Sequence, residues 1–202
     1  MNVQAVIFDI GNVLIGWQPE RHFDRVVGED RRRALFAALD LHGMNDRVDR
    51  GESFHAVLDE TIAAHPDWAE ELTLWREDWL ALTGPVIEGS VELLRRLRDA
   101  GVPVFALSNF GVETFAMAEP AYPVLAEFDR RYISGQMAMA KPDAAIYAAV
   151  EADCGLPPAS LLFIDDRADN IAAAEARGWQ GHLFDGPEGL RERLVAEGLL
   201  ED

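Results

Sequence analysis

Short apolar runs separated by longer amphipathic stretches alternate along most of the chain. Stretches with the period of a helix lie at 90–101, 141–155 and 168–178, and each of them ends at a glycine. Strands that alternate with helices of this length indicate right-handed βαβ units, so we predict an α/β fold with a Rossmann-like parallel sheet. The runs that indicate strands buried on both faces are residues 5–8, 102–107, 161–164 and, more weakly, 181–184.

Residues 17–84 interrupt this alternation. They contain several helical patterns and no convincing strand, and they stand between the first predicted strand and the next βαβ unit. We therefore predict an α-helical insertion over 17–84. The core is then made of residues 1–16, which hold the first strand and its loop, and of residues 85–202.

Composition and charge limit the classes of partner. The chain has 202 residues with 36 acidic and 18 basic side chains, a formal net charge of −18. Such a charge disfavours binding to nucleic acid and to an anionic membrane. Cys154 is the only cysteine, so no intramolecular disulfide can form, and no signal peptide or membrane span is apparent. We expect a cytoplasmic monomer.

Polar groups stand at the ends of three predicted strands and before one helix. In an open parallel sheet, ligands bind beyond the carboxyl ends of the strands, so neighbouring strands would bring these groups to one crevice. Each group alone is readily explained as a helix cap or a turn, but four of them in this order are not. They are Asp9, Ser108 with Asn109, Lys141, and Asp165 with Asp166.

This set of side chains predicts a particular chemistry. Clustered carboxylates repel one another and require a cation, and hard oxygen ligands suit Mg²⁺. Asp9 can then attack a phosphorus atom and form an aspartyl-phosphate. The metal, Lys141, the Ser108 hydroxyl and loop amides would neutralise the oxygens of the transferred group.

The same segments resemble the motifs of the haloacid dehalogenase-like (HAD) hydrolase superfamily. "VIFDIGNVL" is similar to the first motif, "VFALSN" to the second, "KPDAAIY" to the third and "LLFIDDRADN" to the fourth. The resemblance covers nearly the whole chain, and the predicted helical insertion resembles the C1-type cap of the family. It is strongest to small bacterial phosphatases of sugar phosphates, including the α-D-glucose-1-phosphate phosphatase type. The resemblance thus implies a small phosphorylated metabolite as substrate.

The resemblance also implies a role for each matching residue. Asp9 matches the nucleophile and a metal ligand, and Lys141 matches the lysine that stabilises charge. The phosphate-binding second motif corresponds to Ser108 and Asn109. The fourth motif implies Asp166 as a metal ligand, Asp165 as a second ligand or an orienting group, and Asn170 as a supporting residue.

Gly11 departs from the phosphatase pattern. The usual first motif is Asp-x-Asp, and its second aspartate protonates the leaving group and then activates water. Gly11 keeps the backbone carbonyl that binds magnesium at this position but has no side chain for proton transfer. General acid–base help contributes typically 10²–10⁴-fold, so a replacement donor matters. His22 is the nearest candidate in the sequence, and a packed or exposed histidine is the alternative interpretation.

Two other functions stay open at this point. A 2-haloacid dehalogenase would use Asp9 on carbon without a metal, and a binding protein could keep the fold without turnover. The adjacent acids Asp165 and Asp166 favour the phosphatase, because an acidic pair near an attacking carboxylate needs a cation. A transferase is disfavoured, since it also requires the carboxylate that is missing at Gly11.

Overall fold

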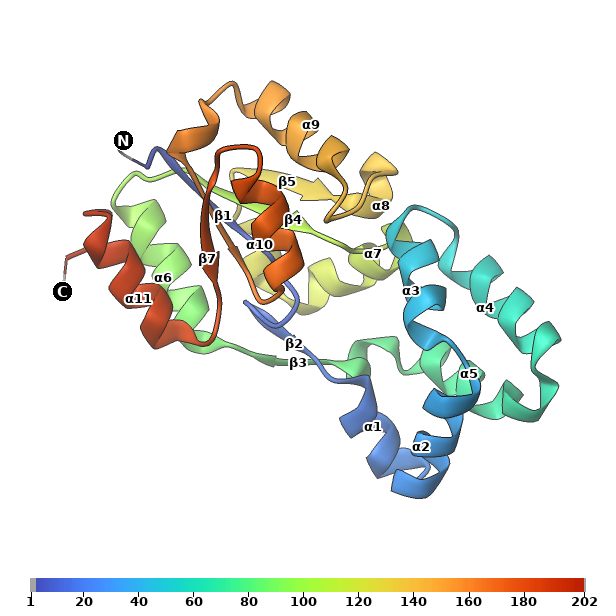
Figure 1. Cartoon of the computed structure of the whole chain (residues 1–202). Coiled ribbons are helices and arrows are strands. Elements are labelled where there is room, and N and C mark those ends of the chain that lie inside the picture. Colours follow the sequence, from blue (N-terminus) through green and yellow to red (C-terminus); the bar gives the residue numbers. More distant parts are fainter. Residues whose placement is uncertain (1–2, 202) are drawn as a thin grey trace.

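A five-stranded, fully parallel sheet forms the centre of the fold, in the order β5-β4-β1-β6-β7 (Figure 1). The computed structural model describes residues 3–201, so residues 1, 2 and 202 of the predicted core lie outside the described part. The predicted α/β class with a parallel sheet is confirmed. The strands are β1 (Ala5–Phe8), β4 (Val104–Ser108), β5 (Arg130–Ile133), β6 (Leu161–Asp165) and β7 (Gln180–Leu183).

Helices cover both faces of this sheet, which explains why its central strands are apolar throughout. Along β1, Val6 and Phe8 point into one hydrophobic layer, and Ala5 and Ile7 point into the other. The first layer packs under α6 (Glu88–Asp99), α7 (Val112–Ala121) and α11 (Pro187–Ala196). The second layer packs under α9 (Ala144–Cys154) and α10 (Ala168–Glu175). Shorter elements of the core are α8 (Ser134–Met137), η3 (Pro123–Ala126) and η4 (Pro158–Ser160).

The remaining helices lie together on one side of the sheet, beyond the carboxyl ends of its strands (Figure 1). We call residues 19–82 the helical segment. Its elements are α1 (Pro19–Val26), α2 (Glu29–Ala38), α3 (Leu41–Asp49), α4 (Phe54–Ala64), η1 (Pro66–Trp68), α5 (Ala69–Glu77) and η2 (Trp79–Leu82). None of the helices within residues 3–201 has the length and apolar character needed to cross a membrane.

A two-stranded antiparallel ribbon joins the helical segment to the core. It consists of β2 (Ile15–Trp17) and β3 (Thr83–Val86), with Ile15 opposite Val86. The prediction of no strand within 17–84 is therefore wrong at both ends of that range. Three and four residues are too few to show a period of two, and Gly84 and Pro85 read as a turn.

Candidate active site

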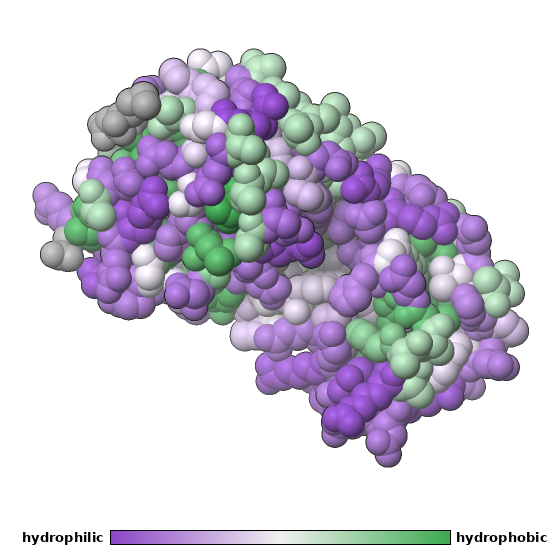
Figure 2. All heavy atoms as spheres, viewed as in Figure 1, coloured by the Kyte–Doolittle hydropathy of each residue, from purple (hydrophilic) through white to green (hydrophobic). Residues whose placement is uncertain are grey.

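The predicted site residues collect at the carboxyl ends of three adjacent strands. The register of the sheet sets the last residue of β1 beside Ala106 of β4 and Ile164 of β6. Asp9 directly follows β1, while Ser108 and Asp165 close the two neighbouring strands. A cavity of about 610 Å³ lies between this edge and the helical segment. Figure 2 shows the hollow between the larger and the smaller part of the molecule.

Lys141 lies at the centre of the site and is the only lysine among the 202 residues. Its Nζ is 3.0 Å from Oδ1 of Asp9 and 2.6 Å from Oδ2 of Asp165. The Lys141 side chain is 1% exposed and that of Asp165 is fully buried. One buried cation therefore holds two carboxylates from adjacent strands, which the sequence only implied.

Burial and the Asp9–Lys141 attraction shift the pKa values of Asp9 and Lys141 in opposite directions. Burial raises the pKa of Asp9 to about 7; the Lys141 charge and hydrogen bonds from Ser108 and Lys141 oppose this rise, whereas Asp165 adds to it. Burial also disfavours the charge on Lys141, but Asp9 and Asp165 together raise the pKa of Lys141 above its usual value. Lys141 thus stays charged at neutral pH, while Asp9 needs a further cation to be fully ionised.

Asp165 is held by donors on all sides. Asn170 Nδ2 donates to both of its carboxylate oxygens at 3.0 Å, and the backbone N–H of Arg167 donates to Oδ1 at 2.8 Å. Because Lys141 also donates to Oδ2, most lone pairs of the Asp165 carboxylate are occupied. This arrangement favours the orienting role that was predicted as one alternative for Asp165, and a supporting role for Asn170.

Asn109 connects the second and the third motif. Its Oδ1 accepts from the backbone N–H of Lys141 at 2.8 Å, and its Nδ2 donates to the Lys141 carbonyl at 2.9 Å. This reciprocal pair fixes the loop before α9 against the end of β4, and the Lys141–Pro142 peptide bond in that loop is cis. The asparagine side chain is therefore used to position Lys141.

Asp166 faces the cavity and is positioned by Asn12. Asn12 Nδ2 donates to Oδ2 of Asp166 at 3.0 Å, and its Oδ1 accepts from the backbone N–H of Trp17 at 2.9 Å. Asn12 has a left-handed φ of 55°, a conformation that asparagine tolerates better than most side chains. Sequence reasoning missed this residue, although "DIGN" follows the first strand directly.

The three acids form a cluster that suits a divalent cation. One carboxylate oxygen each from Asp9, Asp165 and Asp166 lies within 4.8 Å of the others. Hard oxygen donors of this kind are what Mg²⁺ and Ca²⁺ prefer.

Gly11 borders the cavity with open space beside it. A Cβ placed on Gly11 would have no heavy atom within 4 Å, and its φ lies outside the left-handed region. The glycine is therefore not imposed by packing or by backbone strain. The position simply lacks the carboxylate that the usual first motif would supply.

Several aromatic side chains line the same cavity as the carboxylates. Trp17 packs against Trp75 and Trp79 with ring centroids 6.1 Å apart in both pairs, and Trp79 also contacts Phe110. The indole N–H groups of Trp75 and Trp79 have no hydrogen-bond partner within residues 3–201. These two nitrogen atoms are buried, so the tryptophans offer a ligand in the cavity their ring surfaces for stacking.

His22 does not reach the cavity. Its Nε2 lies 3.0 Å from Oδ2 of Asp78, and its Nδ1 lies 3.0 Å from Nη2 of Arg25. The imidazole is buried and both of its nitrogens are engaged, so it is a packed histidine. Of the neighbouring side chains, Trp17 and Phe110 line the cavity, whereas Arg21 and Phe115 do not.

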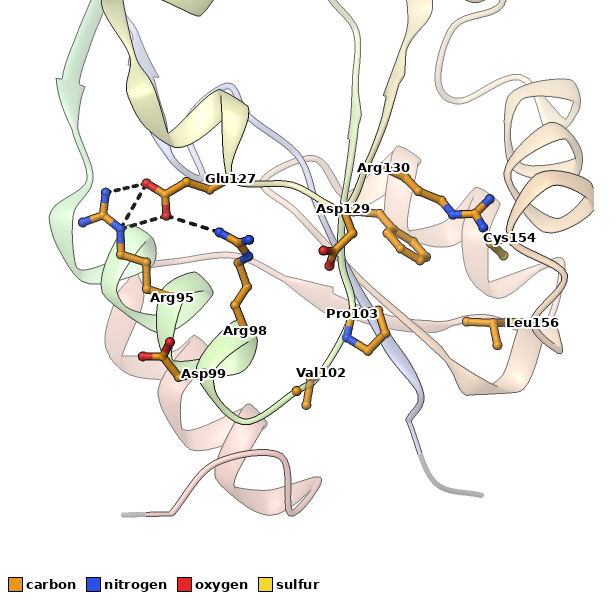
Figure 3. A pocket seen from close by; sticks show the side chains of 12 residues that line it. Arg95, Arg98, Asp99, Val102, Pro103, Glu127, Asp129, Arg130, Cys154 and Leu156 are labelled. Atoms are coloured by element: carbon orange, nitrogen blue, oxygen red, sulfur yellow. Dashed lines mark hydrogen bonds and ion pairs between the residues drawn. The ribbon is translucent and has the colours of Figure 1, made fainter.

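A second hollow of about 790 Å³ lies at the opposite end of the sheet, where β4 and β5 begin (Figure 3). Its cations already have partners. Arg95 and Arg98 both face Glu127, and Arg130 pairs with Asp153. This hollow therefore has no uncompensated charge to recognise an anion.

Two curated proteins that are similar to this chain, a cyclase and a phosphatase, differ in their activities. The chain is 23% identical to the drimenol cyclase of Aspergillus calidoustus over 196 residues, 96% of this chain and 36% of the cyclase. It is 33% identical to the sesquiterpene phosphatase of Aspergillus oryzae over 94 residues, 46% of this chain and 48% of the phosphatase. The chain thus spans half or less of the length of these two relatives.

Solved structures share the fold at low identity. A HAD family enzyme of Bacteroides thetaiotaomicron, in complex with magnesium and inorganic phosphate, superposes with a TM-score of 0.73 at 23% identity, covering 92% of this chain and 96% of that one. The L-2-haloacid dehalogenase of Xanthobacter autotrophicus superposes with a TM-score of 0.63 at 20% identity, covering 96% and 83%. Residues 3–178, which run from the first strand past α10, match the haloacid dehalogenase-like hydrolase family, and the protein therefore belongs to that family of hydrolases.

Proposed function

We propose that this protein is a magnesium-dependent phosphatase that hydrolyses a small phosphomonoester through an aspartyl-phosphate on Asp9. The observation that supports it most strongly is the single lysine buried between Asp9 and Asp165, with Asp166 beside them at the same strand edge. A buried cation next to a carboxylate cluster suits a substrate with several negatively charged oxygens.

The donor set fits magnesium. Asp9, Asp166 and the backbone carbonyl of Gly11 would hold the ion, with Asp165 as a further oxygen close by. Bound there, magnesium supplies positive charge beside the phosphoryl oxygens and the carboxylates. The magnesium and phosphate in the Bacteroides thetaiotaomicron enzyme support this assignment.

The residues of the chain then divide the reaction between them. An oxygen of Asp9 attacks the phosphorus atom in line with the leaving alcohol and forms the acyl phosphate. Lys141 stabilises the phosphoryl oxygens while Asn109 keeps its backbone in place. Ser108, a buried residue at the end of β4, would supply its hydroxyl as a further donor to the phosphate. Water then releases phosphate from Asp9.

We further propose that the helical segment acts as a cap and selects the organic part of the substrate. A sugar phosphate is the first candidate from the motif resemblance. The aromatic wall of Trp17, Trp79 and Phe110 suits the apolar face of a sugar ring and equally a hydrocarbon group. The sesquiterpene phosphatase relative makes prenyl phosphates the second class to assay.

A panel of sugar, nucleotide, prenyl and aryl phosphates, with and without magnesium, tests this function. We expect phosphate release with magnesium, and a loss of at least about 10³-fold in Asp9→Asn. Asp153→Asn, an exposed aspartate at the end of α9, is the matched control and should keep full activity. Chloride released from 2-chloropropionate in the presence of a chelator, with no phosphate from any ester, would establish the dehalogenase instead. Binding of magnesium and a sugar phosphate without either product would establish a binding protein.

A further inference from the structure

The proposed phosphatase reaction requires a proton on the leaving oxygen, and the first motif cannot deliver it. Gly11 has no side chain, and His22 has both nitrogens engaged outside the cavity. In an in-line displacement the leaving oxygen lies on the far side of phosphorus from Asp9. The helical segment lines the cavity together with the strand edge, and it carries titratable side chains that can supply the donor.

Asp49 is the carboxylate that the helical segment brings deepest into the site. It is the last residue of α3, it is partly buried, and it lines the same cavity as Asp9 and Lys141. Asn45, one turn earlier on α3, donates from Nδ2 to Oδ2 of Asp49 at 2.9 Å. Within residues 3–201 the Oδ1 atom of Asp49 has no hydrogen-bond donor, so this oxygen is available to a ligand.

The backbone around Asp49 is fixed to the core by three contacts. The Ser134 hydroxyl donates to the carbonyl of Asp49 at 2.5 Å, and Arg50 pairs with Asp143 at 2.6 Å. Val48 approaches Gly111 so closely that a Cβ on the glycine would lie 2.4 Å from Val48 Cγ1. These contacts hold this end of α3 in place relative to the strand edge.

We propose that Asp49 is the general acid and general base of the phosphatase reaction, and that it replaces the carboxylate absent at Gly11. In the first step the Asp9–phosphorus bond forms, the bond from phosphorus to the ester oxygen breaks, and the Asp49 proton moves to that oxygen to give the alcohol. In the second step the Asp49 carboxylate takes a proton from water as the water oxygen bonds to phosphorus. The Asp9–phosphorus bond breaks, inorganic phosphate leaves, and Asp49 is protonated again.

The electrostatic surroundings of Asp49 suit both steps. Burial, together with the negative charges of Asp46 and Asp9, raises the pKa of Asp49 to about 7, while Lys141 and the hydrogen bond from Asn45 oppose the rise. Arg50 is next in sequence, but its guanidinium is shared between Asp46 and Asp143. A carboxyl group near this value is present in both protonation states at neutral pH.

His42 and Asp46 are the other titratable side chains that α3 contributes to the cavity. Asp46 is exposed and pairs with Arg50. His42 is also exposed and lies near the first turn of the helix, seven residues before Asp49, which is about 10 Å along the axis. Asp49 is less exposed and interacts electrostatically with both Asp9 and Lys141, so it is the best placed of the three.

Leaving-group dependence tests this assignment, because a general acid matters most when the departing oxygen is basic. Wild type, Asp49→Asn, His42→Gln and the exposed control Asp30→Asn are compared on glycerol 2-phosphate and p-nitrophenyl phosphate, with magnesium. For Asp49→Asn we expect kcat on the alkyl ester to fall by about 10²–10⁴-fold. On the aryl ester we expect a burst of about one p-nitrophenol per enzyme, followed by slow turnover, with phosphoenzyme visible by intact mass.

The outcomes separate this inference from the function on which it rests. If wild type releases no phosphate from any ester, the proposed function fails and the role of Asp49 fails with it. If wild type is active but Asp49→Asn loses the same factor on both esters, or shows no phosphoenzyme, Asp49 is not the acid and base. The same signature in His42→Gln in place of Asp49→Asn would assign the role to His42. Thermal midpoints that are not lower than that of wild type exclude unfolding of the variants as the cause.

Discussion

Replacing Lys141 by methionine removes the one cation that two buried carboxylates share. Methionine fills nearly the same volume, so the change is mainly one of charge. The Lys141 and Asp165 side chains are 1% and 0% exposed, so water cannot substitute for the lost ammonium group. Breaking a buried ion pair from one side costs about 3–5 kcal/mol. For a chain of this length that corresponds to a fall of about 6–20 °C in the thermal midpoint.

The loss should depend on pH in a defined direction. Without Lys141 the pKa of Asp9 rises further above its ordinary value, so the folded variant retains a proton that the unfolded chain releases. Stability then falls as pH rises from about 4 through neutrality. Urea unfolding of metal-free wild type and Lys141→Met at pH 5 and pH 8 measures this. A deficit below about 1 kcal/mol at pH 8, or one of equal size at both pH values, would refute the reasoning.

Three further predictions concern the metal, Gly11 and Asp49. Magnesium at a hundredfold excess over its Kd should stabilise wild type by about 2.7 kcal/mol, about 5–11 °C by thermal melting, and Asp166→Asn should lose most of this gain. Gly11→Asp should fold, because a Cβ at this position meets no heavy atom within 4 Å. Steady-state assays should show faster turnover of glycerol 2-phosphate by this variant. Insoluble protein would contradict the conclusion that there is open space beside Gly11. Asp49→Asn should stabilise the metal-free protein by about 2–4 kcal/mol at pH 8 and by less at pH 5, because burial raises the pKa of Asp49 to about 7. Urea titrations at the two pH values measure this gain, and an equal gain at both would contradict the prediction.

Local patterns in the sequence were sufficient for four of the five strands of the central sheet and for the residues at their ends. β1 and the first four residues of β6 are apolar runs that are readily identified as strands, and each run is followed directly by an aspartate, Asp9 or Asp165. The topology then determines the rest, because adjacent parallel strands deliver their end residues to one edge. Lys141 was assigned to this edge through its motif, and it does lie between the two acids.

Features that depend on pairing between distant segments could not be predicted from local sequence patterns. β5 begins with the exposed residues Arg130 and Arg131 and is an edge strand of four residues, so its sequence does not read as a buried strand. The ribbon of β2 and β3 is formed by segments more than sixty residues apart. Asp49 is one of several acids on a polar helix, and only the packing of α3 against Ser134 and Gly111 distinguishes it.

The presence of a single lysine has a practical consequence for chemistry on this protein. All other basic side chains that count toward its charge are arginines, which amine acylating reagents do not modify under mild conditions. Besides the α-amino group, such a reagent has one target, and it is 2% exposed in the folded state. Its acylation rate therefore reports how often the strand edge opens to solvent, and a ligand that occupies the cavity should slow that reaction.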